Sequence, residues 1–157
     1  GVAAGAGVSL ALTCDMAVAA SSASFIQAFC KIGLMPDAGG TWLLPQRVGM
    51  ARALGLSMTG DKLTAAQAKE WGLIWDVVEG GPQECLVAAL ALAQRLAALP
   101  TQALVTMRQT MYAGLQRSFD AQLGAERDAQ SALGKTHDYI EGVMAFREKR
   151  PAQFKGH

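Results

Sequence analysis

The segment Gly33-Leu34-Met35-Pro36-Asp37-Ala38-Gly39-Gly40-Thr41-Trp42 places one carboxylate in a turn rich in proline and glycine, between apolar residues. No other carboxylate in the sequence has such apolar and constrained neighbours. We expect this turn to remove water from Asp37, which suits a group that accepts a proton from one atom and returns it to another. An N-cap of the following helix is an equally good interpretation, because aspartate is a preferred cap.

A second turn of small residues, Gly5-Ala6-Gly7-Val8, leads into an apolar run with helical character. Glycine lets the backbone turn tightly and lets a ligand approach its N–H groups. The start of a helix also presents free N–H donors and a partial positive charge, which suit a developing oxyanion. Close helix packing is the commoner role of such small residues, so the local sequence leaves both interpretations open.

The composition is typical of one globular domain and has no strong charge bias. The chain has 157 residues, of which 51% are hydrophobic and 17% charged, and its formal net charge is +1. This balance does not favour binding to nucleic acid or to a membrane surface. No uninterrupted apolar run reaches the roughly 18 residues of a membrane span, so we expect none.

The cysteines and histidines limit the chemistry further. Cys14, Cys30 and Cys85 are odd in number and widely spaced, which predicts reduced, buried thiols in a cytoplasmic protein and no metal site. The only histidines are His137 and His157, so the sequence gives little support for a nucleophilic site of the Ser-His or Cys-His kind.

The first part of the chain alternates short strands with helices. We predict strands at 16–20, 25–27 and 73–78, and helices at 41–47, broken by Pro45, and at 49–58. The second of these helices is expected to turn Ala53, Leu54 and Met58 inward. A capping box at Thr64 to Gln67 opens a short helix that Gly72 ends.

The second part is helical and amphipathic. Helices are predicted over 83–99, over 101–117 with Thr101 as cap, and after the caps Ser118 and Thr136. Their apolar stripes must pack against something, and the few strands are a small partner for them. We therefore divide the chain into a core region, 1–80, and a helical oligomerisation region, 81–157.

Several segments together resemble the crotonase (enoyl-CoA hydratase/isomerase) family. They are Gly1 to Asp15, Lys31 to Thr41, Leu44-Pro45, Val48-Gly49 and Phe146 to Phe154, so the likeness covers essentially the whole chain. The resemblance implies part of an α/β crotonase fold, with short strands of the spiral core followed by C-terminal trimerisation helices. The family's second oxyanion donor and most of its coenzyme A loop would precede Gly1, so we expect the chain alone to be incomplete and inactive.

The resemblance also assigns roles to individual residues. The two glutamates of family hydratases fall at Ser9 and Phe29, so hydration is not expected, whereas family isomerases place an aspartate at Asp37. Ala6 falls at an oxyanion-hole N–H, and Gly7 supports its turn. An acyl pocket would be lined by Ile26, Phe29 and Trp42, for which plain core is an equally good interpretation. Coenzyme A would contact Phe146, Lys149 and Arg150, although basic residues there also suit the helix dipole.

The function that follows from this resemblance is an acyl-CoA isomerase. The segments 25–29 and 37–42 carry a likeness to the subgroup that isomerises ring-1,2-epoxyphenylacetyl-CoA and shifts enoyl-CoA double bonds. The family implies no metal and no cofactor beyond the coenzyme A of the substrate, and a homotrimer or a dimer of trimers. A hydratase-like enzyme and a non-catalytic oligomerisation module remain the alternatives.

Overall fold

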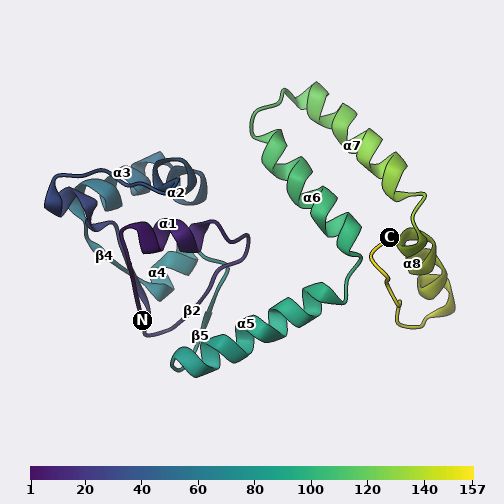
Figure 1. The fold of residues 1–157 in the computed structure, drawn as a ribbon, viewed down its shortest axis with the longest axis horizontal. Coiled ribbons are helices and arrows are strands. Elements are labelled where there is room, and N and C mark those ends of the chain that lie inside the picture. The colour runs from purple at the N-terminus through teal and green to yellow at the C-terminus, as the bar shows by residue number, and fades with distance from the viewer. The chain divides into compact units, whose positions relative to one another are not determined.

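The computed structural model describes all 157 residues and divides them into two compact units, Gly1–Leu90 and Ala91–His157 (Figure 1). The first unit holds all five strands and most of the short helices. Helix α5 (Pro82–Ala97) begins in the first unit and ends in the second. It corresponds to the helix predicted over 83–99, and Pro82 is its first residue, where a missing N–H costs nothing.

Two small sheets form the backbone of the first unit. One has the order β1 (Val2–Ala4), β3 (Ser24–Ile26), β4 (Lys62–Thr64), in which β1 and β3 are parallel and β4 is antiparallel. The other pairs β2 (Val18–Ala20) with β5 (Asp76–Val78) in parallel. The predicted strands 16–20, 25–27 and 73–78 overlap β2, β3 and β5, whereas β1 and β4 were not predicted.

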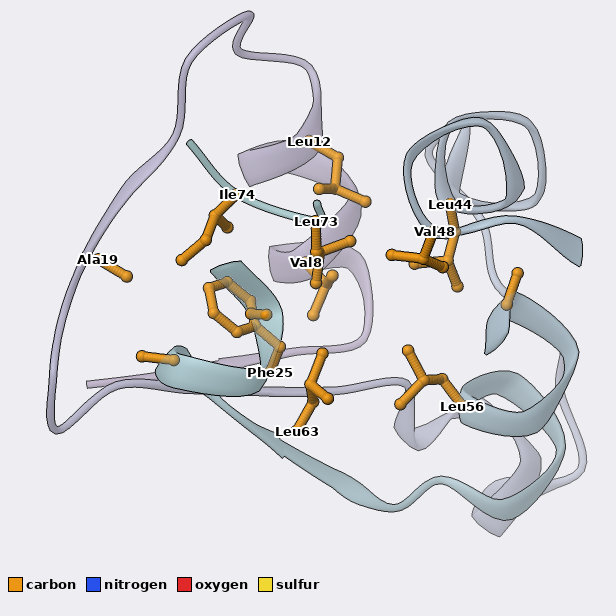
Figure 2. Packing of buried hydrophobic residues seen from close by; sticks show 13 residues of the cluster. Val8, Leu12, Ala19, Phe25, Leu44, Val48, Leu56, Leu63, Leu73 and Ile74 are labelled. Carbon is orange, nitrogen blue, oxygen red and sulfur yellow. The ribbon is translucent and has the colours of Figure 1, made fainter. Parts of the chain in front are cut away.

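Helices pack around these sheets and enclose one apolar core. They are α1 (Ala6–Leu12), the 3-10 helix η1 (Ala28–Ile32), α2 (Gly40–Val48), α3 (Met50–Thr59) and α4 (Ala65–Glu70). Figure 2 shows Val8 and Leu12 of α1 among Phe25 of β3, Leu63 of β4 and Leu73, all of them buried. This core therefore fixes α1 against the strands that precede and follow it.

The structure corrects two predictions about α2 and α3. Pro45 does not break α2, which continues to Val48 because Leu44 and Val48 on either side of the proline are buried. On α3 the buried residues are Ala53 and Leu56 rather than Leu54 and Met58. The side chains of Leu54 and Met58 are 44% and 71% exposed, because they border a surface cavity described below.

The second unit consists of α6 (Thr101–Gly114), α7 (Phe119–Leu133), α8 (His137–Glu148) and a C-terminal tail. Predicted caps are confirmed at three helices: Thr64 forms the capping box of α4, Ser118 accepts from the Ala121 N–H, and Thr136 accepts from the Tyr139 N–H. Thr101 is not a cap, because Pro100 takes that position and Thr101 is the first helical residue.

Burial in the second unit is sparse. Helices α5, α6 and α7 contain no buried residue, and only Asp138 and Ala145 are buried between residues 91 and 157. No single helix is both long and apolar enough to cross a membrane, although α5 and α6 together, as a bent pair, meet the criteria of length and composition. The three cysteines are free, as predicted, but none is buried: Cys14 is exposed in the bend after α1, and Cys30 and Cys85 are half-buried.

Candidate active site

The turn before α1 presents the first N–H groups of that helix. Gly5, at φ 51°, caps α1, and its own N–H donates to the Ile26 carbonyl oxygen at 2.8 Å, which ties the turn to β3. Ala6 and Gly7 are the first two helical residues and are exposed. Backbone N–H groups in these positions have no acceptor within a helix, so they can serve a ligand oxygen.

The predicted base lies in a turn between η1 and α2. The Gly40 N–H donates to the Asp37 carbonyl oxygen at 2.8 Å and closes this turn. The cap of α2 is Gly39, in the left-handed region at φ 80°, and no side chain caps the helix. The structure therefore excludes the interpretation of Asp37 as an N-cap.

The carboxylate of Asp37 has no structural partner in the chain. It is exposed and makes no hydrogen bond or ion pair with another residue. The expected removal of water is wrong for this chain, because the apolar neighbours Leu34 and Met35 are themselves 61% and 69% exposed and do not cover the carboxylate. Ala38, the next residue, has φ 48°, a conformation that non-glycine residues adopt at a cost and that is common at functional sites.

Ser9 and Phe29, the positions that the resemblance assigns to the hydratase glutamates, carry no charge. Phe29 is buried, and its ring lies 3.4 Å from the place of a Cβ on Gly5, so it packs on the turn before α1. Ser9 is fully buried in α1 and faces Gly40 of α2. The structure thus brings Phe29 to the N–H turn and brings α1 to the helix that follows Asp37.

A cavity of about 440 Å³ opens beside the Asp37 turn. It is mostly apolar and is lined by Cys30, Leu34, Met35, Pro36, Gly40, Thr41, Leu44, Pro45, Met50, Ala53, Leu54, Ser57 and Met58. The α3 side of this cavity, with Met50, Leu54 and Met58, was not predicted to line a pocket, although these apolar residues have helical spacing in the sequence. The predicted pocket residues Ile26, Phe29 and Trp42 do not line this cavity; Ile26 borders a much smaller cavity of about 10 Å³, and Trp42 is 43% exposed.

The three residues predicted to contact coenzyme A, Phe146, Lys149 and Arg150, differ in their surroundings. The Phe146 side chain is 86% exposed and borders a cavity of about 430 Å³ in the second unit. Arg150 donates to both Glu141 oxygens at 2.6 and 2.9 Å and to Glu148 at 2.6 Å, and these bonds raise the pKa of its guanidinium. Lys149, which is exposed and has no such partner, is therefore the cation of this group whose charge is not already paired.

Residues 1–157 match the protein family described as "Enoyl-CoA hydratase/isomerase". The chain belongs to this family. It is 50% identical over 157 residues to the 1,2-epoxyphenylacetyl-CoA isomerase of Escherichia coli (strain K12), a match that covers 99% of the chain and 59% of that protein. It is 48% identical over 156 residues to a Rhodobacter capsulatus protein named "Probable enoyl-CoA hydratase", with coverage of 99% and 60%.

Solved structures support the same assignment. An enoyl-CoA hydratase from Polaromonas sp. JS666 superposes with a TM-score of 0.94 at 36% identity, over 99% of this chain and 60% of that one. The crotonase fold expected from the sequence is therefore confirmed, and the chain spans about 60% of the length of the relatives that it matches.

Proposed function

We propose that the protein is an acyl-CoA isomerase in which Asp37 carries the proton. The Asp37 carboxylate takes a proton from C2 of a 3-enoyl thioester, and the electron pair moves through the double bond to the thioester oxygen as a dienolate. The same carboxyl then returns the proton to C4, which leaves a 2-enoyl thioester. The observation that carries this proposal is an exposed, unpaired Asp37 carboxylate, while Ser9 and Phe29 offer none.

The dienolate oxygen needs donors that are already in place. The Ala6 N–H, at the start of α1 and supported by Gly7, is the donor proposed for this oxygen. By resemblance to the family, a second donor comes from sequence that precedes Gly1. One donor without the other would stabilise the oxyanion only in part, which is the reason to propose that the 157 residues alone are inactive.

The apolar cavity beside Asp37 suits an apolar acyl group, either a ring or a linear enoyl chain. The Escherichia coli relative, an isomerase of 1,2-epoxyphenylacetyl-CoA, supports the ring. For coenzyme A we propose Lys149 and Phe146, both of them exposed, and Arg150 in second place because two carboxylates hold it. A cytoplasmic homotrimer, or a dimer of trimers, completes the proposal.

The test needs a complete fold, which a chimera can supply. The part of the Escherichia coli isomerase that this chain does not cover is joined to the 157 residues, and conversion of 3-enoyl-CoA to 2-enoyl-CoA is measured. Because general acid–base catalysis contributes roughly 10²–10⁴-fold, Asp37→Asn should lower kcat by about that factor. Asp61→Asn changes another exposed aspartate without a side-chain partner and is the matched control. Full activity of the Asp37→Asn chimera would remove Asp37 from the reaction.

Two alternatives have support of their own. The name of the Rhodobacter capsulatus relative favours a hydratase, and the chimera would then add water to 2-enoyl-CoA at a rate that exceeds isomerisation. The unburied helices α5, α6 and α7 favour an oligomerisation module, for which sedimentation would show an assembly of the 157-residue chain and calorimetry no heat with coenzyme A.

A further inference from the structure

Ser9 and Gly40 join the two halves of the candidate site. Ser9 lies on α1, two residues after Gly7, and Gly40 is the first residue of α2, three residues after Asp37. A Cβ on Gly40 would lie 2.5 Å from the Ser9 Oγ and 3.3 Å from the Pro36 Cβ. The two helices can therefore approach this closely only because residue 40 has no side chain.

Neither residue is explained by conformation or by stability. Gly40 is helical and is not among the glycines with positive φ, so its backbone would accept alanine. The Ser9 side chain is 0% exposed, and its hydroxyl has no hydrogen-bond partner, which is unfavourable in a core. What the pair does achieve is a tight contact in which the Ser9 Oγ fills the space against the Gly40 backbone.

We propose that this contact is a positioning device that sets the distance between the N–H donors and the base. The donors Ala6 and Gly7 are one helical turn or less from Ser9, and the Asp37 turn ends at Gly40. Any change in the spacing of α1 and α2 moves the donors relative to the carboxylate. Ser9 and Gly40 would then govern catalysis without touching the substrate. This inference rests on the proposed function of Asp37.

A double-mutant cycle in the chimera tests the contact. Because a misplacement of about 1 Å can cost about 100-fold in rate, Gly40→Ala should lower kcat by about 30-fold or more, with a change in KM of less than about threefold. Ser9→Ala removes the atom that closes the contact, so it should lower kcat by about threefold while the Tm stays level or rises. The double variant should recover at least about tenfold of the kcat lost in Gly40→Ala, because the 2.5 Å approach is gone.

A matched control separates this contact from the general effect of alanine in a helix. Gly55 lies in α3 with nothing within 4 Å of the place of its Cβ, so Gly55→Ala should leave kcat as it is. The positioning role is refuted if Gly40→Ala leaves kcat unchanged, as Gly55→Ala should. It is also refuted if adding Ser9→Ala to Gly40→Ala does not restore kcat. Isomerase activity that survives Asp37→Asn would refute the proposed function instead, and a chimera without activity would refute both.

Discussion

The two units of the chain keep their shape by different means. In the first unit, thirteen buried apolar residues form one cluster that connects the strands with α1, α2, α3 and α4 (Figure 2). In the second unit the buried residues are Asp138 and Ala145, and long helices leave large apolar side chains exposed. A candidate base and its donors lie on the packed unit, where a displacement is costly.

In the second unit, hydrogen bonds to carboxylates hold the C-terminal tail against α8, where few residues are buried. The tail after α8 is held by Asp138, which accepts from the Lys155 and Gly156 N–H groups, both at 2.7 Å. Glu141 accepts from the Gln153 N–H at 2.8 Å as well as from Arg150. We therefore expect cavity-forming substitutions to damage the first unit, and changes of charge or pH to release the tail.

The largest expected effect is a cavity in the first unit. Leu12 is 1% exposed, so Leu12→Ala should lower the free energy of unfolding by about 2–5 kcal/mol. Urea unfolding followed by tryptophan fluorescence measures this, because Trp42, Trp71 and Trp75 all lie in the first unit.

The matched variant in the second unit is Leu123→Ala, on a side chain that is 48% exposed in α7. Its cost, followed by far-UV circular dichroism, should be about 1 kcal/mol or less. If Leu123→Ala lowers the free energy of unfolding as much as Leu12→Ala does, and more at higher protein concentration, another chain covers this helix. That result would contradict the contrast between the two units.

A smaller and more local effect is expected when the tail loses its anchor. Asp138→Ala removes the acceptor of two backbone N–H groups, so the Lys155 and Gly156 amides should exchange hydrogen at least about tenfold faster. Asp120→Ala is the control, because Asp120 also lies in the first turn of its helix but accepts from no tail residue. Unchanged exchange in Asp138→Ala would show that the tail is held by packing, for example by Phe154 against Gly142.

Features that depend on a few neighbouring residues were predictable from the sequence. The caps Thr64, Ser118 and Thr136 begin their helices as expected, because each cap bonds an N–H only three residues away. The crotonase fold was also predictable, since its motifs run through the chain. Thr101 failed as a cap because the choice between it and Pro100 depends on the backbone before the helix.

Features that depend on distant contacts were not predictable. The exposure of Asp37 follows from where Leu34 and Met35 point, and the inward face of α3 follows from which helix packs on it. The close approach of Ser9 to Gly40 joins residues 31 positions apart and leaves no mark in either local sequence. For the same reason the sequence did not predict that residues of α3 line the cavity beside the Asp37 turn.

The smallest expected effect is the response of the tail to acid. Hydrogen bonds from Arg150 and from the Gln153 N–H lower the pKa of Glu141 from 4.5 to about 2. Burial raises the pKa of Asp138, but hydrogen bonds from the Lys155 N–H and from His137 outweigh it, so this pKa also lies below its usual value. A lowered carboxyl pKa in the folded state stabilises that state above the unfolded pKa, and the stabilisation is lost as the pH falls toward the folded pKa.

Between about pH 4.5 and pH 2, the Gln153 amide should therefore lose protection against hydrogen exchange. Tryptophan fluorescence should change less over this range, because the first-unit carboxylates with a lowered pKa, Asp76 and Glu84, are half exposed or exposed and contribute little. Glu141→Gln cannot titrate, so its Gln153 amide should exchange at a rate that no longer depends on this acid window. If the tryptophan signal changes first, the packed unit is the acid-sensitive one, and the contrast between the two units is reversed.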